Sequence, residues 1–275
     1  MTPRDAHPDL NRDLTFVPSV CDTPQHLSPA QIGQYNENGY IFPLDVYTPD
    51  EVVANRAYFD ELMAQATAAG WDAYSINGWQ DQCAGMYDMI VEPRILDYVE
   101  DLLGSHLICW GAHFFCKMPG DVRHVSWHQD ASYWPLSPSK TVTVWLAIDD
   151  ADVGNGCMRF VSGSHRAGQL EFRASEASEN NVLNQTVEDV EQYGNLVDDE
   201  LKAGEISIHS DLLLHSSHYN ESDRRRCGLT LRYCTPDVRA VPGFNWEKEG
   251  VLINCSDPSG HWGHPPRPER DFEIA

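Results

Sequence analysis

Between residues 107 and 233 the sequence is a succession of short segments in which apolar and polar residues alternate, separated by turn-forming residues. The clearest is TVTVWLAI at residues 141–148, and shorter ones follow at 205–208 and 229–233. Because neighbouring side chains of a strand point to opposite faces of a sheet, this alternation predicts β-strands. Many short strands with frequent turns are typical of a barrel or jelly roll. We therefore expect a mainly β core.

The residues before this region show the signals of flanking helices. The stretches SPAQ at 28–31 and TPDE at 48–51 have the form of capping boxes with proline at the first helical position. Apolar residues at helical spacing between Pro93 and Gly104 predict a third helix. A chain of 275 residues suits one such domain. We expect an N-terminal arm (1–27), a mainly helical part (28–104), a β core (105–235) with an insertion or lid (162–203), and a C-terminal tail (236–275).

The charge and composition of the chain exclude some classes of function. The formal net charge of −23 argues against nucleic-acid binding, which needs a basic surface. It is most simply a solubility adaptation, and a preference for cationic or zwitterionic substrates is the alternative. The sequence contains no run of 18 or more apolar residues, so no membrane span is expected. The first residues lack the features of a signal peptide, and the eight cysteines form no close CxxC pair. We expect a soluble, cytoplasmic protein with reduced thiols, and the sequence does not indicate its oligomeric state.

The segment SWHQD at 126–130 carries the main chemical signal. In an extended strand His128 and Asp130 point to the same face, at a spacing that suits two ligands of one metal ion. A second histidine brought in by the fold would complete the two-His-one-carboxylate site that leaves positions open on non-haem Fe(II).

His215 is our candidate for that second histidine. It follows the apolar segment 212–214, so a rigid strand could carry it to the mouth of a barrel. His209 has the same alternation parity, but six strand residues span about 20 Å, so both could bind one ion only if the chain turned sharply between them. His218 falls in a turn-like stretch at 216–220.

The run Arg224-Arg225-Arg226 leads into the predicted strand at 227–233. A guanidinium group matches a carboxylate in bidentate geometry, so an arginine of this run could hold the far carboxylate of a chelating 2-oxo acid. The alternative is a solvated basic turn that balances nearby acidic residues.

Together these residues resemble the phytanoyl-CoA dioxygenase family of Fe(II)/2-oxoglutarate oxygenases. The resemblance covers about residues 28–233 and rests on WHQD at 127–130, YWP at 133–135, VWLAI at 144–148, NG at 155–156, GSH at 163–165, GE at 204–205, and HSS at 215–217 followed by Arg226. It implies a double-stranded β-helix of the jelly-roll, cupin-like type. The implied Fe(II) ligands are His128, Asp130 and His215, and the implied 2-oxoglutarate-binding residues are Arg226, Ser217, Gln129 and Trp145.

The resemblance also implies a reaction. It is the hydroxylation of an unactivated C–H bond of a small molecule by O2 and 2-oxoglutarate, with release of succinate and CO2. Related halogenases carry Gly or Ala where this chain has Asp130, so an oxidation without halide is expected. Bacterial members of the family act on small molecules such as amino acids and aminophosphonates, which makes a small zwitterion the expected substrate.

Tyr133 and Trp134 follow the metal-binding strand and are the expected substrate contacts, with core packing as the alternative. Two other classes of function are compatible with the same residues. One is a zinc-dependent hydrolase or lyase with a His2Asp site, which would need neither O2 nor a 2-oxo acid. The other is a non-catalytic jelly-roll binding module.

Overall fold

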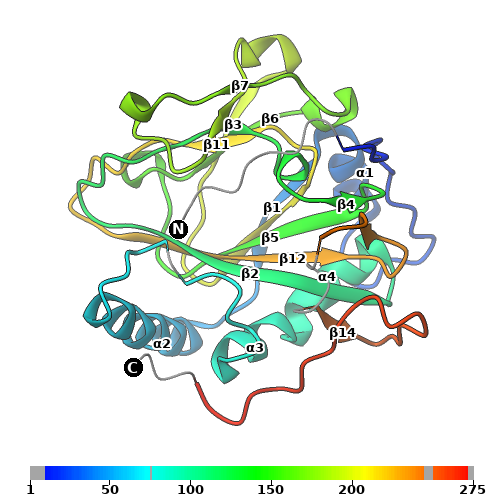
Figure 1. The fold of residues 1–275 in the computed structure, drawn as a ribbon, viewed down its shortest axis with the longest axis horizontal. Coiled ribbons are helices and arrows are strands. Elements are labelled where there is room, and N and C mark those ends of the chain that lie inside the picture. Colours follow the sequence, from blue (N-terminus) through cyan, green and yellow to red (C-terminus); the bar gives the residue numbers. More distant parts are fainter. Residues whose placement is uncertain (1–9, 75, 245–249, 272–275) are drawn as a thin grey trace.

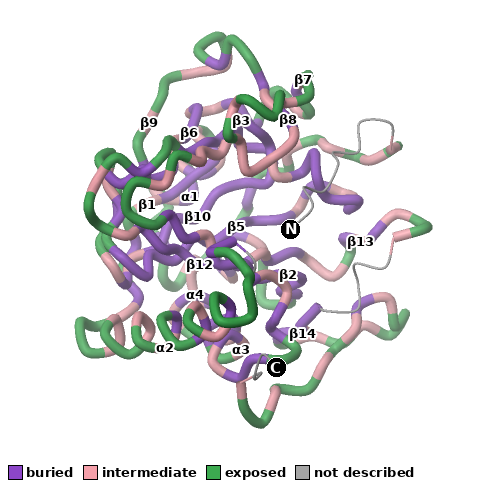
Figure 2. The backbone as a smooth tube through the Cα atoms, turned by 60° about the vertical axis from the view of Figure 1, so that its left-hand side comes forward, coloured by how far each residue is buried: buried purple, intermediate pink, exposed green. Residues whose placement is uncertain are grey.

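The chain folds into two facing antiparallel sheets, and helices cover the outer side of the larger one (Figure 1). The computed structural model describes residues 10–74, 76–244 and 250–271. The strands are buried along most of their length, whereas α2 and the loops carry many of the exposed residues (Figure 2). This arrangement is the mainly β fold with flanking helices that the sequence predicts.

The larger sheet has the strand order β1 (Tyr40–Asp45), β10 (Glu205–Ser210), β5 (Thr141–Ala147), β12 (Arg226–Cys234), β2 (Leu107–Lys117) and β14 (Val251–Ile253). The smaller sheet has the order β3 (Val125–His128), β11 (His215–Ser217), β6 (Met158–Val161) and β9 (Leu196–Asp199). Two short pairs join β4 (Leu136–Ser137) to β13 (Arg239–Ala240) and β7 (Arg173–Ala174) to β8 (Gln185–Thr186).

The helices are α1 (Pro29–Asn38), α2 (Pro49–Ala68), α3 (Ala84–Ile90) and α4 (Pro93–Leu103). Both predicted capping boxes are present, at Ser28 and at Thr48, each with its two reciprocal hydrogen bonds. The sequence does not predict α3, whose N-cap residue Cys83 makes no side-chain cap hydrogen bond. Every helix in the described part of the chain is too short or too polar to cross a lipid bilayer.

The two faces of the larger sheet differ in chemistry. On β12, the odd-numbered residues from Cys227 to Tyr233 belong to the hydrophobic core shared with α2, α3 and α4. The even-numbered Arg226, Thr230 and Arg232 line a cavity between the sheets. Strand β5 alternates in the same way, with Thr143 and Trp145 toward the cavity. The larger sheet therefore separates a helix-covered apolar core from a polar interior.

Two segments differ from the predicted strands. Strand β3 ends at His128, and Asp130 begins a 3-10 turn, Asp130–Ser132. Residues 211–213 form a turn, so His215 begins β11, whereas the sequence predicted a strand ending there. Within the expected insertion, β9 pairs with β6 of the smaller sheet, and the C-terminal tail contributes β14 to the edge of the larger sheet.

The described part of the N-terminal arm, residues 10–27, is fixed to α4 through one carboxylate. The buried Asp101 accepts backbone N–H groups from Gln25 (3.0 Å to Oδ1), His26 (2.7 Å to Oδ2) and Leu27 (2.7 Å to Oδ2). Burial alone would raise the pKa of Asp101, but these donors outweigh burial and leave the pKa below its ordinary value.

Replacing Asp101 by asparagine is expected to lower the free energy of unfolding at pH 7 by about 1–3 kcal/mol, because buried N–H donors lose their charged acceptor. A depressed pKa in the folded state stabilises the fold above the unfolded-state value of about 4, and this stabilisation is lost as the pH falls through the folded-state pKa. The variant should therefore lose less stability than the wild type on acidification. Denaturant unfolding at pH 7 and near pH 3 measures both effects.

Asp97→Asn, on the same helix with 40% of its side chain exposed, is the control and should change stability by less than about 0.5 kcal/mol. An Asp101→Asn variant as stable as this control at pH 7 would contradict the assigned role.

Candidate metal centre

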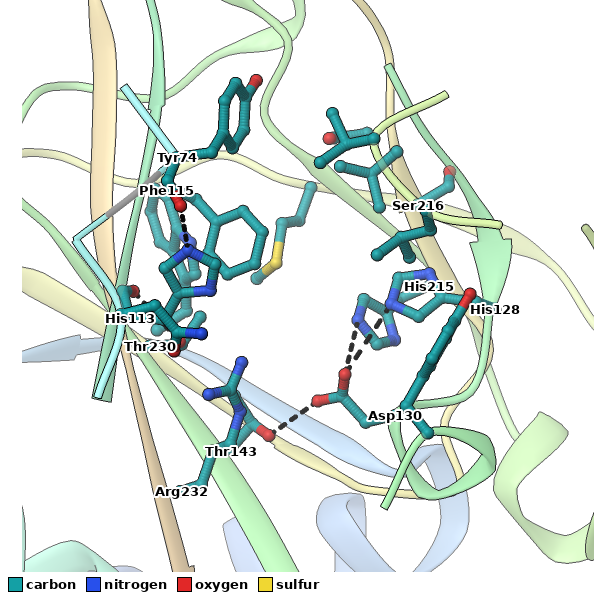
Figure 3. A pocket seen from close by; sticks show the side chains of 18 of the residues that line it. Tyr74, His113, Phe115, His128, Asp130, Thr143, His215, Ser216, Thr230 and Arg232 are labelled. Atoms are coloured by element: carbon teal, nitrogen blue, oxygen red, sulfur yellow. Dashed lines mark hydrogen bonds and ion pairs between the residues drawn. The ribbon is translucent and has the colours of Figure 1, made fainter. Parts of the chain in front are cut away.

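His128, Asp130 and His215 meet at one end of the smaller sheet. His128 and His215 are directly paired across β3 and β11, and their ring centroids are 4.1 Å apart. Oδ1 of Asp130 lies 3.7 Å from Nε2 of His128 and 3.9 Å from Nε2 of His215. One ligand atom from each residue lies within 4.8 Å of the other two, and all three side chains face the cavity (Figure 3). Although Asp130 lies in a 3-10 turn, it occupies the position predicted from the strand pattern.

A hydrogen bond from Nδ1 to a backbone carbonyl oxygen orients each imidazole so that its Nε2 can bind a metal. Nδ1 of His128 lies 2.8 Å from the carbonyl oxygen of Ser126, and Nδ1 of His215 lies 2.9 Å from that of Leu213. Because a carbonyl oxygen only accepts, Nδ1 carries the proton in each ring and Nε2 keeps a lone pair facing Asp130. Histidine ligands of metals commonly donate their other N–H in this way.

The protonation states also suit a divalent cation. Burial, reinforced by His128, lowers the pKa of His215 well below its ordinary value, so the imidazole is neutral. Burial would raise the pKa of Asp130, but the close imidazoles of His128 and His209 and the neighbouring charges of His215 and Arg232 hold it well below its ordinary value. Thr143 donates a further hydrogen bond of 2.9 Å to Oδ2 of Asp130. Two imidazoles that present Nε2 and one carboxylate form a donor set that fits a metal ion on one side and leaves its other side open to the cavity.

His209 also lies beside this cluster, because the chain makes the sharp turn that the strand spacing required for His209 and His215 to meet. The chain turns sharply after β10, with the N–H of Leu213 bonded to the carbonyl oxygen of Ser210. The rings of His209 and His215 have centroids 4.7 Å apart, and Nε2 of His209 lies 3.8 Å from Oδ2 of Asp130. Neither ring nitrogen of this buried histidine has a hydrogen-bond partner among the described residues.

Arg226 begins β12 and points into the same cavity, where it is 2% exposed. Its Nε and Nη2 donate to the carbonyl oxygen of Gly156 at 3.0 and 2.6 Å, and its Cζ lies 5.5 Å from the centre of the Trp145 ring. A Cβ atom on Gly228 would overlap this indole, so glycine is required at that position. Ser217 also lines the cavity. Arg226, Trp145 and Ser217, predicted around one cosubstrate, are thus brought together.

Gln129 is placed differently from the prediction. It is not among the residues that line the cavity, because it alternates to the opposite side from His128. Its Nε2 donates to the carbonyl oxygens of Gly168 and Leu212, and its Oε1 accepts the N–H of Leu170. The side-chain amide therefore holds two loops behind the metal ligands, and its hydrogen bonds are made away from the expected cosubstrate.

The cavity has a volume of about 750 Å³ and is lined by residues of both sheets. The two expected substrate contacts, Tyr133 and Trp134, both line it. Burial lowers the pKa of the cavity residue Lys117 to about 6, so its amine is largely neutral at pH 7. The charged lining residues of the described chain are then Arg123, Arg226, Arg232, Asp72 and Asp130. Arg232 was not predicted, although its shared parity with Arg226 on one strand was a signal for it.

Comparison with known families places this geometry among oxygenases. The family model of phytanoyl-CoA dioxygenase (PhyH) matches residues 35–228. The peroxisomal phytanoyl-CoA dioxygenase of Bos taurus is 27% identical over 172 residues, which cover 58% of this chain and 51% of the relative. Phytanoyl-CoA dioxygenase of Arabidopsis thaliana is 31% identical over 146 residues, 53% of this chain and 49% of the relative. The matches thus span about half the length of these relatives.

Solved structures share the architecture over most of the chain. The apo form of ThoJ, a non-heme monooxygenase, is 28% identical with a TM-score of 0.74 and covers 87% of this chain and 89% of its own. CytC3 with Fe(II) and alpha-ketoglutarate is 22% identical with a TM-score of 0.65, covering 96% of this chain and 97% of its own. These similarities confirm the predicted jelly-roll class of fold.

Proposed function

Because this chain belongs to the phytanoyl-CoA dioxygenase family, we propose that it uses Fe(II), 2-oxoglutarate and O2 to hydroxylate a C–H bond of a small molecule, releasing succinate and CO2. The observation that carries the proposal is the arrangement of His128, Asp130 and His215, whose ligand atoms lie within 4.8 Å of one another at the wall of a large cavity. These three side chains would hold the iron. When bound, Fe(II) supplies the oxidising chemistry with O2 and the 2-oxo acid.

Other residues of the cavity would bind the cosubstrate and orient the metal ligands. The Arg226 guanidinium, fixed by Gly156 and Trp145, is placed to bind the distal carboxylate of 2-oxoglutarate, and Ser217 to donate to the same molecule. The Thr143 hydroxyl fixes the Asp130 carboxylate, so that its Oδ1 faces the two imidazoles. Substrate in the remaining cavity volume excludes water from the reacting C–H bond. The intact Asp130 supports hydroxylation over halogenation.

The test is anaerobic spectroscopy of the purified protein. Addition of Fe(II) and then 2-oxoglutarate should produce a weak visible charge-transfer band that neither Zn(II) nor succinate elicits. Admission of O2 in the presence of substrate should then yield succinate in amounts equal to the hydroxylated product, which is heavier by one oxygen atom.

A protein that retains zinc, gives no band and binds no 2-oxoglutarate would instead support a hydrolase or lyase. If it binds small molecules without turning them over, the binding-module alternative applies. The cytoplasmic location expected from the sequence stays a prediction, and the relatives include peroxisomal enzymes.

A further inference from the structure

His209 is a buried histidine beside the metal centre that has no part in the chemistry proposed above. It is 1% exposed and lines the cavity, on the face of β10 next to its cross-strand neighbour Thr143 of β5. Its ring packs against that of Phe160, with centroids 5.4 Å apart, and against that of His215, at 4.7 Å. These two neighbours restrict the ring, so an oriented imidazole lies at the wall of the cavity.

The position of His209 is close to the metal site but outside its ligand set. The ligand atoms that lie within 4.8 Å of one another belong to His128, Asp130 and His215. Nε2 of His209 lies 3.8 Å from Oδ2 of Asp130, which exceeds the length of about 2.7–3.2 Å that an N–H···O hydrogen bond has. That oxygen accepts instead from the Thr143 hydroxyl, at 2.9 Å. His209 therefore neither completes the ligand set nor holds the carboxylate by a hydrogen bond.

Both ring nitrogens of His209 are buried, and neither is hydrogen-bonded to another described residue. An imidazole carries at least one N–H in either protonation state, so the ring has a donor to offer. A buried donor without an acceptor costs free energy, which a ligand of the cavity would recover. By contrast, Nδ1 of His128 and Nδ1 of His215 already donate to backbone carbonyl oxygens. His209 thus presents a hydrogen-bond donor beside the metal to a molecule that binds in the cavity.

Strand β5 relates His209 to the cosubstrate. Its cavity-facing residue Trp145 lies beside Arg226, which we assign to the distal carboxylate of 2-oxoglutarate. Two residues earlier on the same strand, Thr143 is bonded to the metal ligand Asp130 and is paired with His209. A 2-oxo acid that extends from Arg226 to the metal therefore has its oxo and 1-carboxylate oxygens on the side of His209. These oxygens are hydrogen-bond acceptors, so they match the donor of the ring.

We propose that His209 is a cosubstrate-binding residue whose ring donates a hydrogen bond to the metal-bound end of the 2-oxo acid. The inference rests on the proposed function, because it takes iron-bound 2-oxoglutarate as the ligand. Arg226 then binds one end of the cosubstrate and His209 the other. Two such contacts fix the orientation in which the 2-oxo acid chelates the metal.

The test measures cosubstrate binding, not turnover. Anaerobic protein loaded with Fe(II) is titrated with 2-oxoglutarate, and the charge-transfer band gives both the dissociation constant and a spectrum. His209→Phe keeps a ring against Phe160 and removes both nitrogens. It should raise the dissociation constant at least about tenfold, as expected for the loss of a hydrogen bond to a charged group.

The spectrum reports whether the ring contacts the oxo acid itself. A hydrogen bond to the oxo acid stabilises the orbital that receives the electron, so the band of His209→Phe should lie at shorter wavelength than that of the wild type. His209→Gln retains an N–H donor and should recover part of the affinity and part of the band position.

Two controls separate this role from a structural one. The Fe(II) affinity of His209→Phe without cosubstrate, measured by equilibrium dialysis, should stay close to that of the wild type. His165→Phe is the matched variant, because His165 is also buried but lies outside the cavity lining, with its Nε2 3.2 Å from the carbonyl oxygen of Asn36. It should bind 2-oxoglutarate with the affinity and the band of the wild type.

The inference is overturned if His209→Phe binds 2-oxoglutarate as tightly as the wild type, or binds it more weakly with an unmoved band. It is overturned as well if the Fe(II) affinity falls by the same factor, because His209 would then act through Asp130. Absence of the band in the wild type refutes the proposed function itself. A normal wild-type band that His209→Phe leaves unchanged refutes only the role of His209.

Discussion

Asp130→Ala is expected to lose O2-dependent succinate formation by a factor on the order of a hundred or more. The loss of an outer partner of a metal ligand already costs about 10–100-fold in affinity or activity, so the loss of a ligand should exceed that range. Asp130 provides the carboxylate of the three-residue cluster found in the described chain. Its replacement leaves only the imidazoles of His128 and His215, with His209 beside them, to face the cation. Succinate formation and equilibrium dialysis of Fe(II) measure the two consequences separately.

Two companion variants make this result interpretable. Thr143→Val keeps the ligand and removes only its hydrogen bond of 2.9 Å, so we expect a smaller loss, about 10-fold at the lower end of the range for outer partners. His124→Ala removes an imidazole that is outside the cavity lining and should behave as the wild type. An Asp130→Ala variant with at least half of the wild-type activity would contradict the ligand assignment.

The metal cluster could be predicted because its signal is local. His128 and Asp130 are separated by one residue, and that spacing brings them together in a strand and still does so in the observed turn. The helices with capping boxes were predictable for the same reason. The position of His209 was not, because it depends on a turn at 210–213 in a stretch whose leucines have the composition of a strand.

The end of the cavity lined by Trp110, Trp134 and Arg232 depends on contacts between distant segments. Trp110 comes from β2, Trp134 follows the metal turn, and Arg232 lies on β12. Alternation places each of them on one face of its own segment, but it does not reveal which segments are neighbours. A single sequence therefore indicated an oxygenase without indicating how this end of the cavity is lined.

Arg226→Met should raise the KM for 2-oxoglutarate by about 30-fold or more and change kcat less. Truncating one partner of a buried, hydrogen-bonded charge pair costs about 2–5 kcal/mol, which corresponds to that factor at the lower end. Methionine keeps much of the side-chain volume beside Trp145 and removes the charge. Steady-state kinetics with varied 2-oxoglutarate, and titration of the anaerobic charge-transfer band, measure the effect.

The adjacent Arg225 supplies a control of identical chemistry. Arg225 directly precedes β12 and points away from the cavity, where its guanidinium pairs with Asp149 at 2.7 Å and with Asp60. The alternative of a basic turn that balances acidic residues thus describes Arg225, while Arg226 is buried beside Trp145. Arg225→Met should lower stability and leave the KM for 2-oxoglutarate within about twofold, since side chains without a shared partner act independently. Equal KM values in the two variants would contradict a special role for Arg226.

The stability of Arg226→Met separates a ligand-binding arginine from a structural one. No carboxylate of the described residues lies within ion-pair distance of Arg226, and burial lowers its pKa, so its charge is costly to the folded protein. Replacement by an apolar side chain should therefore leave the cosubstrate-free protein about as stable as the wild type, or more so. Saturation with 2-oxoglutarate at about 100 times its dissociation constant should stabilise the wild type by about 2.7 kcal/mol and the variant much less. A variant that is strongly destabilised without cosubstrate, yet gains the full stabilisation on adding it, would make Arg226 a structural residue.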